Sequence, residues 1–276
     1  MPFTVLISVY YKEKAENLQQ CLDSVFRQTL PPDEVVLVED GPLTPELDAV
    51  VDSFCRDHQE LKVVKDPINQ GLDVALNNGL RQCTYDLIAR MDSDDISMPR
   101  RFEKQVGYME QHPETDVVSA WIDEFTTDPR HIISTRKVPE TNKEVYTFGQ
   151  KRNPVNHPVS MYRRKAVACM GGYYHFPLFE DYYLWVRMLI NGYHFHNLQE
   201  PLLYFRRTPD LYRRRGGWGY AWVEMKFQLT LHDMGYISLW RMVSNLFVRS
   251  SVRVMPNRLR GWFYTLFLRK KKDKKT

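Results

Sequence analysis

The stretch "ARMDSDDISMPRR", residues 89–101, gathers three acids, Asp92, Asp94 and Asp95, directly after an apolar run. Two aspartates one residue apart offer several carboxylate oxygens, which suit a hard cation such as Mg²⁺ or Mn²⁺. A cation held there keeps open positions that a diphosphate can fill. The same acids also suit a solvated turn that caps the next helix and complements its dipole. Spacing alone therefore leaves a metal site and a capping turn both open.

A second acidic pair, Glu180 and Asp181, opens another apolar segment at "FED". A carboxylate within hydrogen-bond reach of a hydroxyl can act as a general base, although acids also favour helix starts for electrostatic reasons. On the same side of the site we consider His157, in "NPVNHPV", as a contact for an acceptor or a phosphate. Arg206 could clamp a diphosphate. The alternatives are a loop histidine and a solvated surface arginine.

Alternating strand and helix patterns must position these residues. Strand-like runs at 3–9, 34–39, 61–64 and 86–91 are separated by apolar stripes at helical spacing. Strands interleaved with helices predict an α/β fold with a mostly parallel central sheet flanked by helices. Ligands of such sheets bind beyond the carboxyl ends of the strands. Because Tyr10, Asp40 and Asp92 each follow or end a predicted strand, we expect one rim to collect them around a nucleotide-sized cleft.

The second half of the chain has a mixed pattern. We predict strands at "VVSAW" from residue 117, at 157–163 and at 201–207, a polar connection through residue 150, and helices at 179–193 and near 218–234. The predicted organisation is one domain in two halves, followed by a tail. Residues 1–116 form the first half, 117–235 the second half of the same domain, and 236–276 a basic amphipathic extension.

The composition of the chain is typical of a globular protein. The chain has 276 residues, of which 43% are hydrophobic and 13% aromatic, enough for a sizeable core. Its four cysteines have no C-x-x-C spacing, so neither a disulfide framework nor a zinc ribbon is indicated. The first residues predict a strand rather than a secretion signal, and no apolar run reaches the roughly 18 residues of a membrane-spanning helix. We expect a cytoplasmic protein.

Charge is distributed unevenly. Residues 241–276 hold 11 Lys and Arg residues and a single acid, Asp273, whereas the rest of the chain is net acidic. An apolar stripe precedes the basic end: Leu239, Trp240, Met242, Val243, Leu246 and Phe247. This pattern favours a helix lying on the anionic inner face of the cell membrane, and the alternative is a helix packed on the catalytic core. An acidic body without a distributed basic face argues against nucleic-acid binding.

Four ordered segments carry a family resemblance: "VLISVYYKE", "CLDSVFRQTLPPDEVVLVEDGP", "NQGLDVALNNGL" and "YDLIARMDSDDISMPRRFEKQ". Together they resemble family 2 glycosyltransferases of the GT-A fold, of the type that builds bacterial capsular or O-antigen polysaccharide. The similarity continues through "NPVNHPVSMYRR", "GGYYHFPLFEDYYLWVRM" and "LLYFRR". Two departures stand out. Ser8-Val9-Tyr10-Tyr11 replaces the frequent Pro-x-Tyr-Asn, and the Q-x-x-R-W element of processive synthases is missing, which favours transfer of a single sugar.

The resemblance implies a role for each matched position. Asp92 and Asp94 correspond to the pair that coordinates Mn²⁺ or Mg²⁺ together with the sugar nucleotide. Asp40 corresponds to the acid that reads the uracil ring, whose N–H a carboxylate can accept. Asp181 corresponds to the catalytic base, with Glu180 as its neighbour or an acceptor ligand. The remaining nucleotide-lining positions are Tyr10, Asn69, Gly71 and Arg90.

The activity implied is inverting, metal-dependent and non-processive transfer of one hexose, with galactose or glucose favoured. The donor is a UDP-sugar, and the acceptor is a saccharide linked to undecaprenyl diphosphate at the inner membrane surface. A transferase that uses a GDP- or dTDP-sugar is the nearest alternative. An alternative of another class is a non-catalytic nucleotide- or lipid-binding scaffold of a polysaccharide assembly complex.

Overall fold

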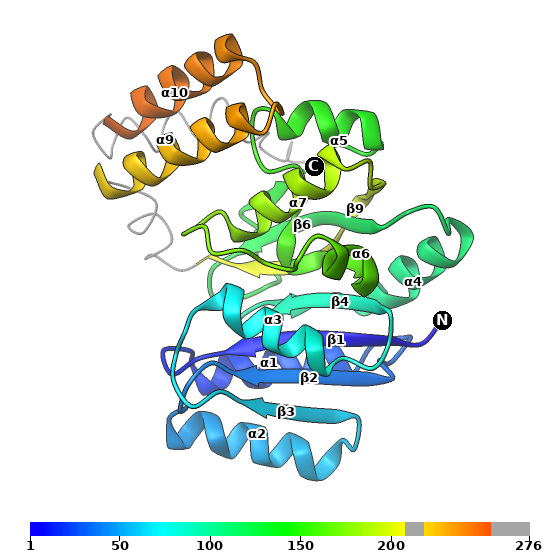
Figure 1. Cartoon of the computed structure of the whole chain (residues 1–276). Coiled ribbons are helices and arrows are strands. Elements are labelled where there is room, and N and C mark those ends of the chain that lie inside the picture. The colour runs from blue at the N-terminus through cyan, green and yellow to red at the C-terminus, as the bar shows by residue number, and fades with distance from the viewer. Residues whose placement is uncertain (208–217, 255–276) are drawn as a thin grey trace, which may run out of the picture.

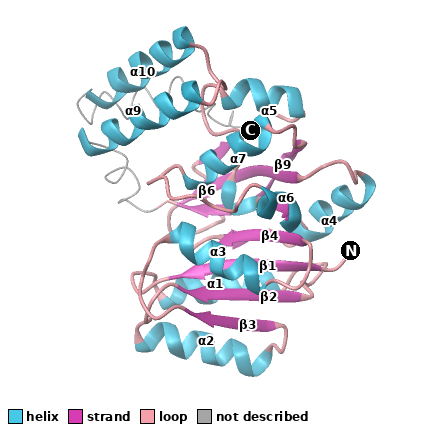
Figure 2. Cartoon of the chain, viewed as in Figure 1, coloured by secondary structure: helices cyan, strands magenta, loops and turns pink. Residues whose placement is uncertain are grey.

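A nine-stranded sheet forms the centre of the molecule (Figure 1). The computed structural model of the chain describes residues 1–207 and 218–254. The strand order is β3-β2-β1-β4-β8-β6-β9-β5, and β7 pairs with β6 outside this path. Helices pack on both faces of the sheet, and Figure 2 separates the strands from these helices by colour.

The first half of the chain alternates strands and helices as predicted. Its elements are β1 (Phe3–Val9), α1 (Ala15–Phe26), β2 (Glu34–Glu39), α2 (Pro45–Asp57), β3 (Leu61–Lys65), α3 (Leu72–Gln82) and β4 (Leu87–Asp92). The pairs β1–β2, β1–β4 and β2–β3 are all parallel. The carboxyl ends of these strands consequently lie on one edge of the sheet, which is where the site forms.

Burial of both sheet faces explains the apolar strand runs. In β1, Val5 and Ile7 belong to the core shared with α1, α2 and α4, whereas Leu6 points to the other core, shared with α3 and α7. Successive strand side chains point to opposite faces, so a strand covered on both sides has no polar face. This is why residues 5–7 of β1 and 35–38 of β2 are continuous apolar runs.

The second half adds antiparallel strands. Its elements are β5 (Ile96–Ser97), α4 (Arg101–Gln111), β6 (Val117–Phe125), β7 (Ser134–Arg136), α5 (Asn142–Gly149), the 3₁₀ helix η1 (His157–Val159), β8 (Met161–Arg163), α6 (Arg164–Cys169), α7 (Glu180–Ile190) and β9 (Phe195–Arg206). β8 runs antiparallel to both β4 and β6, while β6 and β9 are parallel. The mostly parallel arrangement therefore gives way to a mixed one here.

Two sequence-based assignments in this half were wrong. Residues 157–159 form η1 rather than the start of a strand, because Pro158 has no N–H to donate to a ladder and the chain turns before β8 begins at Met161. The connection through residue 150 contains β7 and α5. Helix α5 starts with a capping box in which Thr141 and Glu144 satisfy each other's backbone N–H groups, a local signal that the polar composition masked.

The two halves are held together by α3 and the loop before α7. The Asn77 amide donates from Nδ2 to the carbonyl of Tyr173 at 2.7 Å, and its Oδ1 accepts from the Tyr173 N–H at 2.9 Å. The neighbouring Gly172 has φ +76°, and a Cβ built there would lie 2.3 Å from Asn77 Oδ1. Only glycine fits this contact, so a glycine and an amide together fix one half against the other.

A C-terminal helical hairpin, α9 (Trp218–Asp233) and α10 (Leu239–Val254), packs at the end of the molecule remote from β3 (Figure 1). Phe227 of α9, together with Tyr236, Met242 and Asn245, is buried. The beginning of the predicted tail therefore packs on the core, and the rest of that tail, residues 255–276, lies outside the described residues. Within the described part of the chain, no helix is long and apolar enough to cross a membrane.

A buried arginine ties α4 to the sheet. Arg101 is fully buried, donates from Nη2 to the carbonyl of Arg90 at 2.6 Å, and donates from Nε to Gln105 Oε1 at 3.0 Å. Burial, together with the nearby charge of Arg90, lowers the pKa of Arg101 to about 9. Its neighbour Arg100 is exposed and pairs only with Glu103 on the surface.

The two arginines provide a matched stability test. Arg101→Ala removes the guanidinium that donates to the Arg90 carbonyl and to Gln105 Oε1, so we expect it to lower the free energy of unfolding by about 3 kcal/mol. Arg100→Ala removes a surface ion pair and should change that free energy by less than about 1 kcal/mol. Urea unfolding monitored by tryptophan fluorescence measures both, and equal effects would contradict this account.

Candidate active site at the strand ends

Three carboxylates meet where β4 ends. Asp92 is the last residue of β4, and Asp94 and Asp95 occupy the turn that leads into β5. One carboxylate oxygen from each of the three lies within 4.8 Å of the others. Asp95 is fully buried, whereas Asp92 and Asp94 are half-buried. The strand end and the turn thus bring together the acids that the sequence analysis selected.

The protonation behaviour of this acidic cluster fits a divalent cation. Burial, followed by the neighbouring charges of Asp92 and Glu13, raises the pKa of Asp94 to about 7. Burial, followed by Asp94 and Asp92, also raises the pKa of Asp95. Asp95 Oδ2 is buried and has no hydrogen-bond partner among the described residues. A hard cation would replace the mutual repulsion of these oxygens by attraction, so the donor set suits Mn²⁺ or Mg²⁺.

A buried guanidinium, that of Arg90, places a positive charge next to the acidic cluster. Arg90 is 1% exposed, and its Nη2 donates to Asp92 Oδ1 at 2.5 Å. Burial lowers the pKa of Arg90, but the charge of Asp92 and its hydrogen bond outweigh that effect, and Asp181 adds to it, so the pKa is raised. Burial raises the pKa of Asp181, and the charge of Arg90 offsets part of that rise. The positive charge of Arg90 therefore acts on the acidic cluster and on the predicted base together.

Asp181 lies in the first turn of α7, half-buried and held by an amide. Asn153 donates from Nδ2 to Asp181 Oδ2 at 2.7 Å. The Val155 N–H donates to Asn153 Oδ1 at 3.2 Å, which orients the amide so that its N–H group faces the carboxylate. Burial raises the pKa of Asp181, and the hydrogen bonds from the Tyr182 backbone and Asn153 only partly offset that rise. A carboxylate with a raised pKa that is fixed in one orientation is suited to general-base work.

Glu180 precedes Asp181 at the start of α7. Its Oε1 accepts from the Leu178 N–H at 3.1 Å, and Leu178 has φ 70°, in the left-handed region. Leucine adopts this conformation only when the surroundings impose it, and the carboxylate of Glu180 supplies part of that constraint. Burial raises the pKa of Glu180.

Asp40, Asn69 and Gly71 come together on the same rim. Asp40 follows β2, and its carboxylate accepts from the Gln70 N–H at 2.7 Å, from Asn69 Nδ2 at 3.0 Å and from the Gly71 N–H at 3.1 Å. A carboxylate has about four lone-pair sites, so Oδ1 retains one for a further donor. Gly41, at φ +81°, allows the loop to approach, because a Cβ there would lie 2.6 Å from the Asn69 nitrogen.

Tyr10 follows β1 on this rim and is half-buried. Its ring meets Tyr11 edge to face, with centroids 5.8 Å apart. Tyr11 is exposed, and Lys12 Nζ lies 5.4 Å from its ring centroid. The rim therefore presents an aromatic side chain next to the loop that Asp40 organises.

Arg206 is attached to the acidic turn rather than left in solvent. Its backbone N–H donates to Asp95 Oδ1 at 2.8 Å, its Nε to the Asp94 carbonyl at 2.8 Å, and its Nη2 to Gln20 Oε1 at 2.8 Å. The guanidinium carbon also lies 4.7 Å from the ring centroid of Phe125. The end of β9 is thereby fixed to the turn that carries Asp94 and Asp95.

His157 is not brought to the rim. It is buried, its Nε2 lies 2.9 Å from the hydroxyl of Tyr173, and Tyr173 donates onward to the hydroxyl of Tyr162 at 3.3 Å. Burial, with the charge of Arg90, lowers the pKa of His157 well below its usual range, so the ring is neutral. The placement indicates that His157 supports the loop around Tyr173 from within the core.

Sequence reasoning gave no role to three residues that the structure places around the acids. Asn153 holds Asp181, Glu13 acts electrostatically on Asp94, and Asp73 pairs with His175 Nδ1 at 3.2 Å. Asn153 stands within the segment "NPVNHPV", but nothing in its spacing relates it to an acid 28 positions later. Only the fold brings these residues together.

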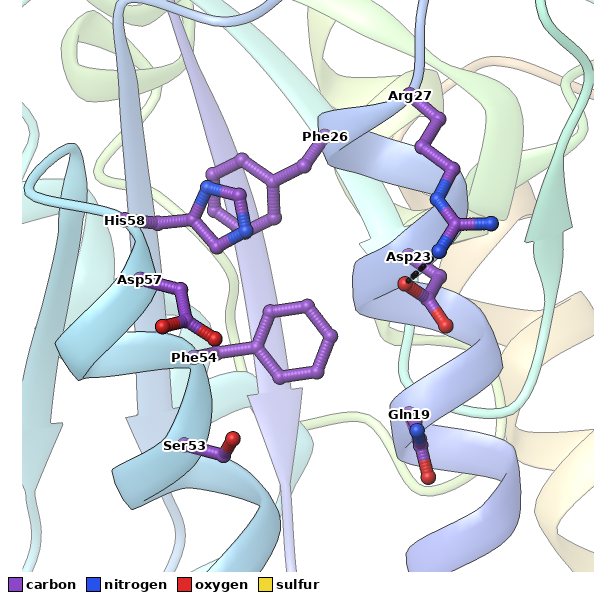
Figure 3. Close-up of a pocket in the computed structure, with 8 residues that line it drawn as sticks. All are labelled: Gln19, Asp23, Phe26, Arg27, Ser53, Phe54, Asp57 and His58. Carbon is purple, nitrogen blue, oxygen red and sulfur yellow. Dashed lines mark ion pairs between the residues drawn. The ribbon is translucent and has the colours of Figure 1, made fainter.

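A separate hollow of about 320 Å³ lies between α1 and α2 (Figure 3). Phe26 and His58 stack across it with ring centroids 3.8 Å apart, and Phe54 packs beside them. Both helices end there, at the edge where the parallel strands begin, so this hollow lies opposite the rim that carries the acids. It is distinct from the site at the strand ends.

Comparison with known proteins agrees with this geometry. The family model described as glycosyl transferase family 2 matches residues 4–171. The amylovoran biosynthesis glycosyltransferase AmsE of Erwinia amylovora is 39% identical over 95% of this chain and 97% of its own length. The UDP-Gal:alpha-D-GlcNAc-diphosphoundecaprenol beta-1,3-galactosyltransferase of Escherichia coli is 36% identical over 97% of both chains.

A solved structure supports the fold. The crystal structure of S. aureus TarS 1–349 in complex with UDP-GlcNAc superposes with a TM-score of 0.65 at 18% identity, covering 97% of this chain and 77% of that one. At this identity the likeness speaks for the fold alone. The family model covers more than half of the chain, and two relatives exceed a third in identity over nearly its full length. The chain therefore belongs to glycosyl transferase family 2 and is a glycosyltransferase.

Proposed function

We propose that this enzyme transfers one hexose, with inversion, from a UDP-sugar to a saccharide carried on undecaprenyl diphosphate, in the synthesis of a surface polysaccharide. Galactose or glucose is the favoured sugar. The proposal is supported by the E. coli relative, whose name specifies UDP-Gal and a GlcNAc-diphosphoundecaprenol substrate, and by AmsE, whose name specifies amylovoran biosynthesis. Residues 1–116 would hold the nucleotide and residues 117–235 the acceptor.

The observation that carries the proposal is the division of the acids into two groups. Asp92, Asp94 and Asp95 cluster at the end of β4, while Asp181 stands apart in α7, and the charge of Arg90 acts on both groups. A displacement with inversion needs such a division, because the leaving diphosphate and the attacking hydroxyl lie on opposite faces of the sugar ring. The clustered acids would hold a cation that stabilises the negative charge of the leaving diphosphate. Asp181 would accept the proton of the attacking hydroxyl.

On the donor side, Asp92 and Asp94 would hold Mn²⁺ or Mg²⁺, and a bound cation would supply positive charge that stabilises the leaving diphosphate. The remaining lone pair of Asp40 is available to the uracil N–H, with Tyr10, Asn69 and Gly71 on the same rim. On the acceptor side, Asp181 takes the proton of the acceptor hydroxyl as that oxygen bonds to the anomeric carbon. The carbon–oxygen bond to the diphosphate breaks, and UDP leaves with the electron pair.

A lipid-linked acceptor would place the enzyme on the inner face of the cell membrane. The excess of Lys and Arg in residues 241–276 supports attraction to anionic head groups. Because Met242 and Asn245 are buried against the core, removing residues 241–276 would also disturb folding. Substitution of exposed residues is therefore the cleaner way to test membrane association.

Nucleotide binding is the first measurement. Calorimetric titration of UDP, GDP and dTDP into the purified chain, with and without Mn²⁺, should give binding of UDP that depends on the metal. Preferential binding of GDP or dTDP would replace the UDP-sugar by another donor. If no nucleotide binds under any condition, the chain acts as a scaffold and the proposal fails.

Two substitutions separate the roles of the acids. Asp181→Asn should lower kcat by roughly 10²-fold or more, because the base is lost, while Mn²⁺-dependent UDP binding stays unchanged. Asp94→Ala should abolish transfer and also weaken that binding by roughly tenfold or more, because a metal ligand is lost. Asp57→Ala, an exposed acid on α2, is the control and should alter neither quantity. Near-normal turnover of Asp181→Asn would refute the base assignment.

The pH–rate profile tests how Asn153 holds the base. Burial raises the pKa of Asp181, and only the deprotonated form accepts a proton, so kcat/KM should fall as pH decreases through that raised pKa. Asn153→Ala removes a hydrogen bond that stabilises the Asp181 carboxylate. The acidic limb of the profile should therefore move to higher pH, and the maximal kcat/KM should fall. Asn191→Ala, at the far end of α7, should leave the limb in place. An unshifted limb in Asn153→Ala would contradict this role.

A further inference from the structure

We infer that the outward faces of α9 and α10 form a docking surface for an anionic lipid bilayer and hold it in a fixed position relative to the catalytic base. The inference rests on the proposed function, since a lipid-linked acceptor would be met at such a surface. It assigns the contact to particular residues of the folded hairpin, including α9, in addition to the basic tail.

Helix α9 carries an apolar stripe that is exposed on the surface of the described part of the chain. Trp218 is 86% exposed and Trp222 is 57% exposed, and Leu229 continues the same face two turns later. The opposite face is buried: Glu224, Phe227, Gln228 and Leu231. Exposed tryptophans in a row on one helix face are unusual for a surface that meets only water.

Helix α10 divides the apolar stripe that its sequence predicts. Met242 and Asn245 are buried on one edge, whereas Trp240 is 83% exposed and Phe247 74% exposed on the other, with Val243 between them. One edge of this helix thus packs on the core, and the other is largely exposed to solvent. The exposed edge is apolar and aromatic, as an interfacial helix requires.

Charge complementarity identifies the occupant. Lys226 Nζ lies 5.6 Å from the ring centroid of Trp222, and Arg241 follows Trp240. The chain beyond residue 240 carries 11 Lys and Arg residues and one acid, while Asp233 is the only acid on the exposed side of α9. Tryptophan with adjacent cations suits the head-group region of a membrane, where the ring meets the acyl boundary and the cation meets phosphate.

The hairpin is packed against the element that carries the base. Phe227 of α9 stacks on Phe179 with centroids 4.6 Å apart and lies 4.8 Å from Tyr182, so it contacts residues on both sides of the pair Glu180 and Asp181. Asn245 of α10 donates to Gln228 Oε1 and to the Gln150 carbonyl, both at 2.8 Å. A bilayer seated on the outer face would therefore be held at a set distance from Asp181.

Vesicle co-sedimentation of the full chain tests the surface. The variant W222Q/W240Q/F247Q changes only exposed rings, and the control I133Q/I190Q changes exposed apolar residues on other elements. Vesicles of phosphatidylglycerol with phosphatidylethanolamine should bind the unsubstituted chain and the control, less so at high salt, and phosphatidylcholine vesicles should bind weakly. The triple variant should bind the anionic vesicles roughly tenfold or more weakly.

Equal binding of the triple variant and the unsubstituted chain overturns the inference. So does sedimentation velocity that shows a dimer of the unsubstituted chain and a monomer of the triple variant, because the occupant would then be a second copy. Mn²⁺-dependent UDP binding is measured on the same proteins. If it persists while vesicle binding is unaffected by the triple substitution, only the docking surface is wrong; if the unsubstituted chain binds no nucleotide, the proposed function fails independently of the vesicle result.

Discussion

Arg90 holds a positive charge inside the sheet beside the three clustered carboxylates of Asp92, Asp94 and Asp95. A guanidinium that is 1% exposed would be strongly unfavourable without a partner, and Asp92 supplies that partner at 2.5 Å. Burial raises the pKa of Asp181 and of Asp95, and the charge of Arg90 offsets part of that rise. Burial lowers the pKa of His157 and of Arg101, and the charge of Arg90 adds to that effect. One buried side chain of β4 thus acts on several ionisable groups of the site.

The fold supplies the positions that this charge balance needs. Parallel strands deliver Tyr10, Asp40 and Asp92 to one edge, and α7 in the second half of the chain brings Asp181 within electrostatic reach of Arg90. Hydrogen bonds then hold the loops in place. Asp40 accepts from backbone N–H groups of residues 70 and 71, and the Arg206 N–H donates to Asp95, which attaches β9 to the acidic turn. Rigid strand ends and tied loops give the site its preorganisation.

The sequence was informative where its signals are local. The strands and helices of the first half follow from apolar periodicity, and Asp40 and Asp92 could be placed on the rim because they stand at strand ends. The burial of His157 and the role of Asn153 could not be predicted, because both depend on contacts with residues distant in the sequence. His157 contacts Tyr173, and Asn153 contacts Asp181. Helix α10 shows the same limit, since its apolar stripe does not reveal which edge packs inward.

The contact between α3 and the loop before α7 has an evolutionary consequence. Gly172 admits no side chain because Asn77 Oδ1 occupies the space where a Cβ would stand, and Asn77 uses both ends of its amide on Tyr173. A change at either position alone would disturb the packing of α3 against the loop before α7. Positions 77 and 172 are thus expected to covary among relatives, so that lineages with a different acceptor loop would have had to replace the amide and the glycine together.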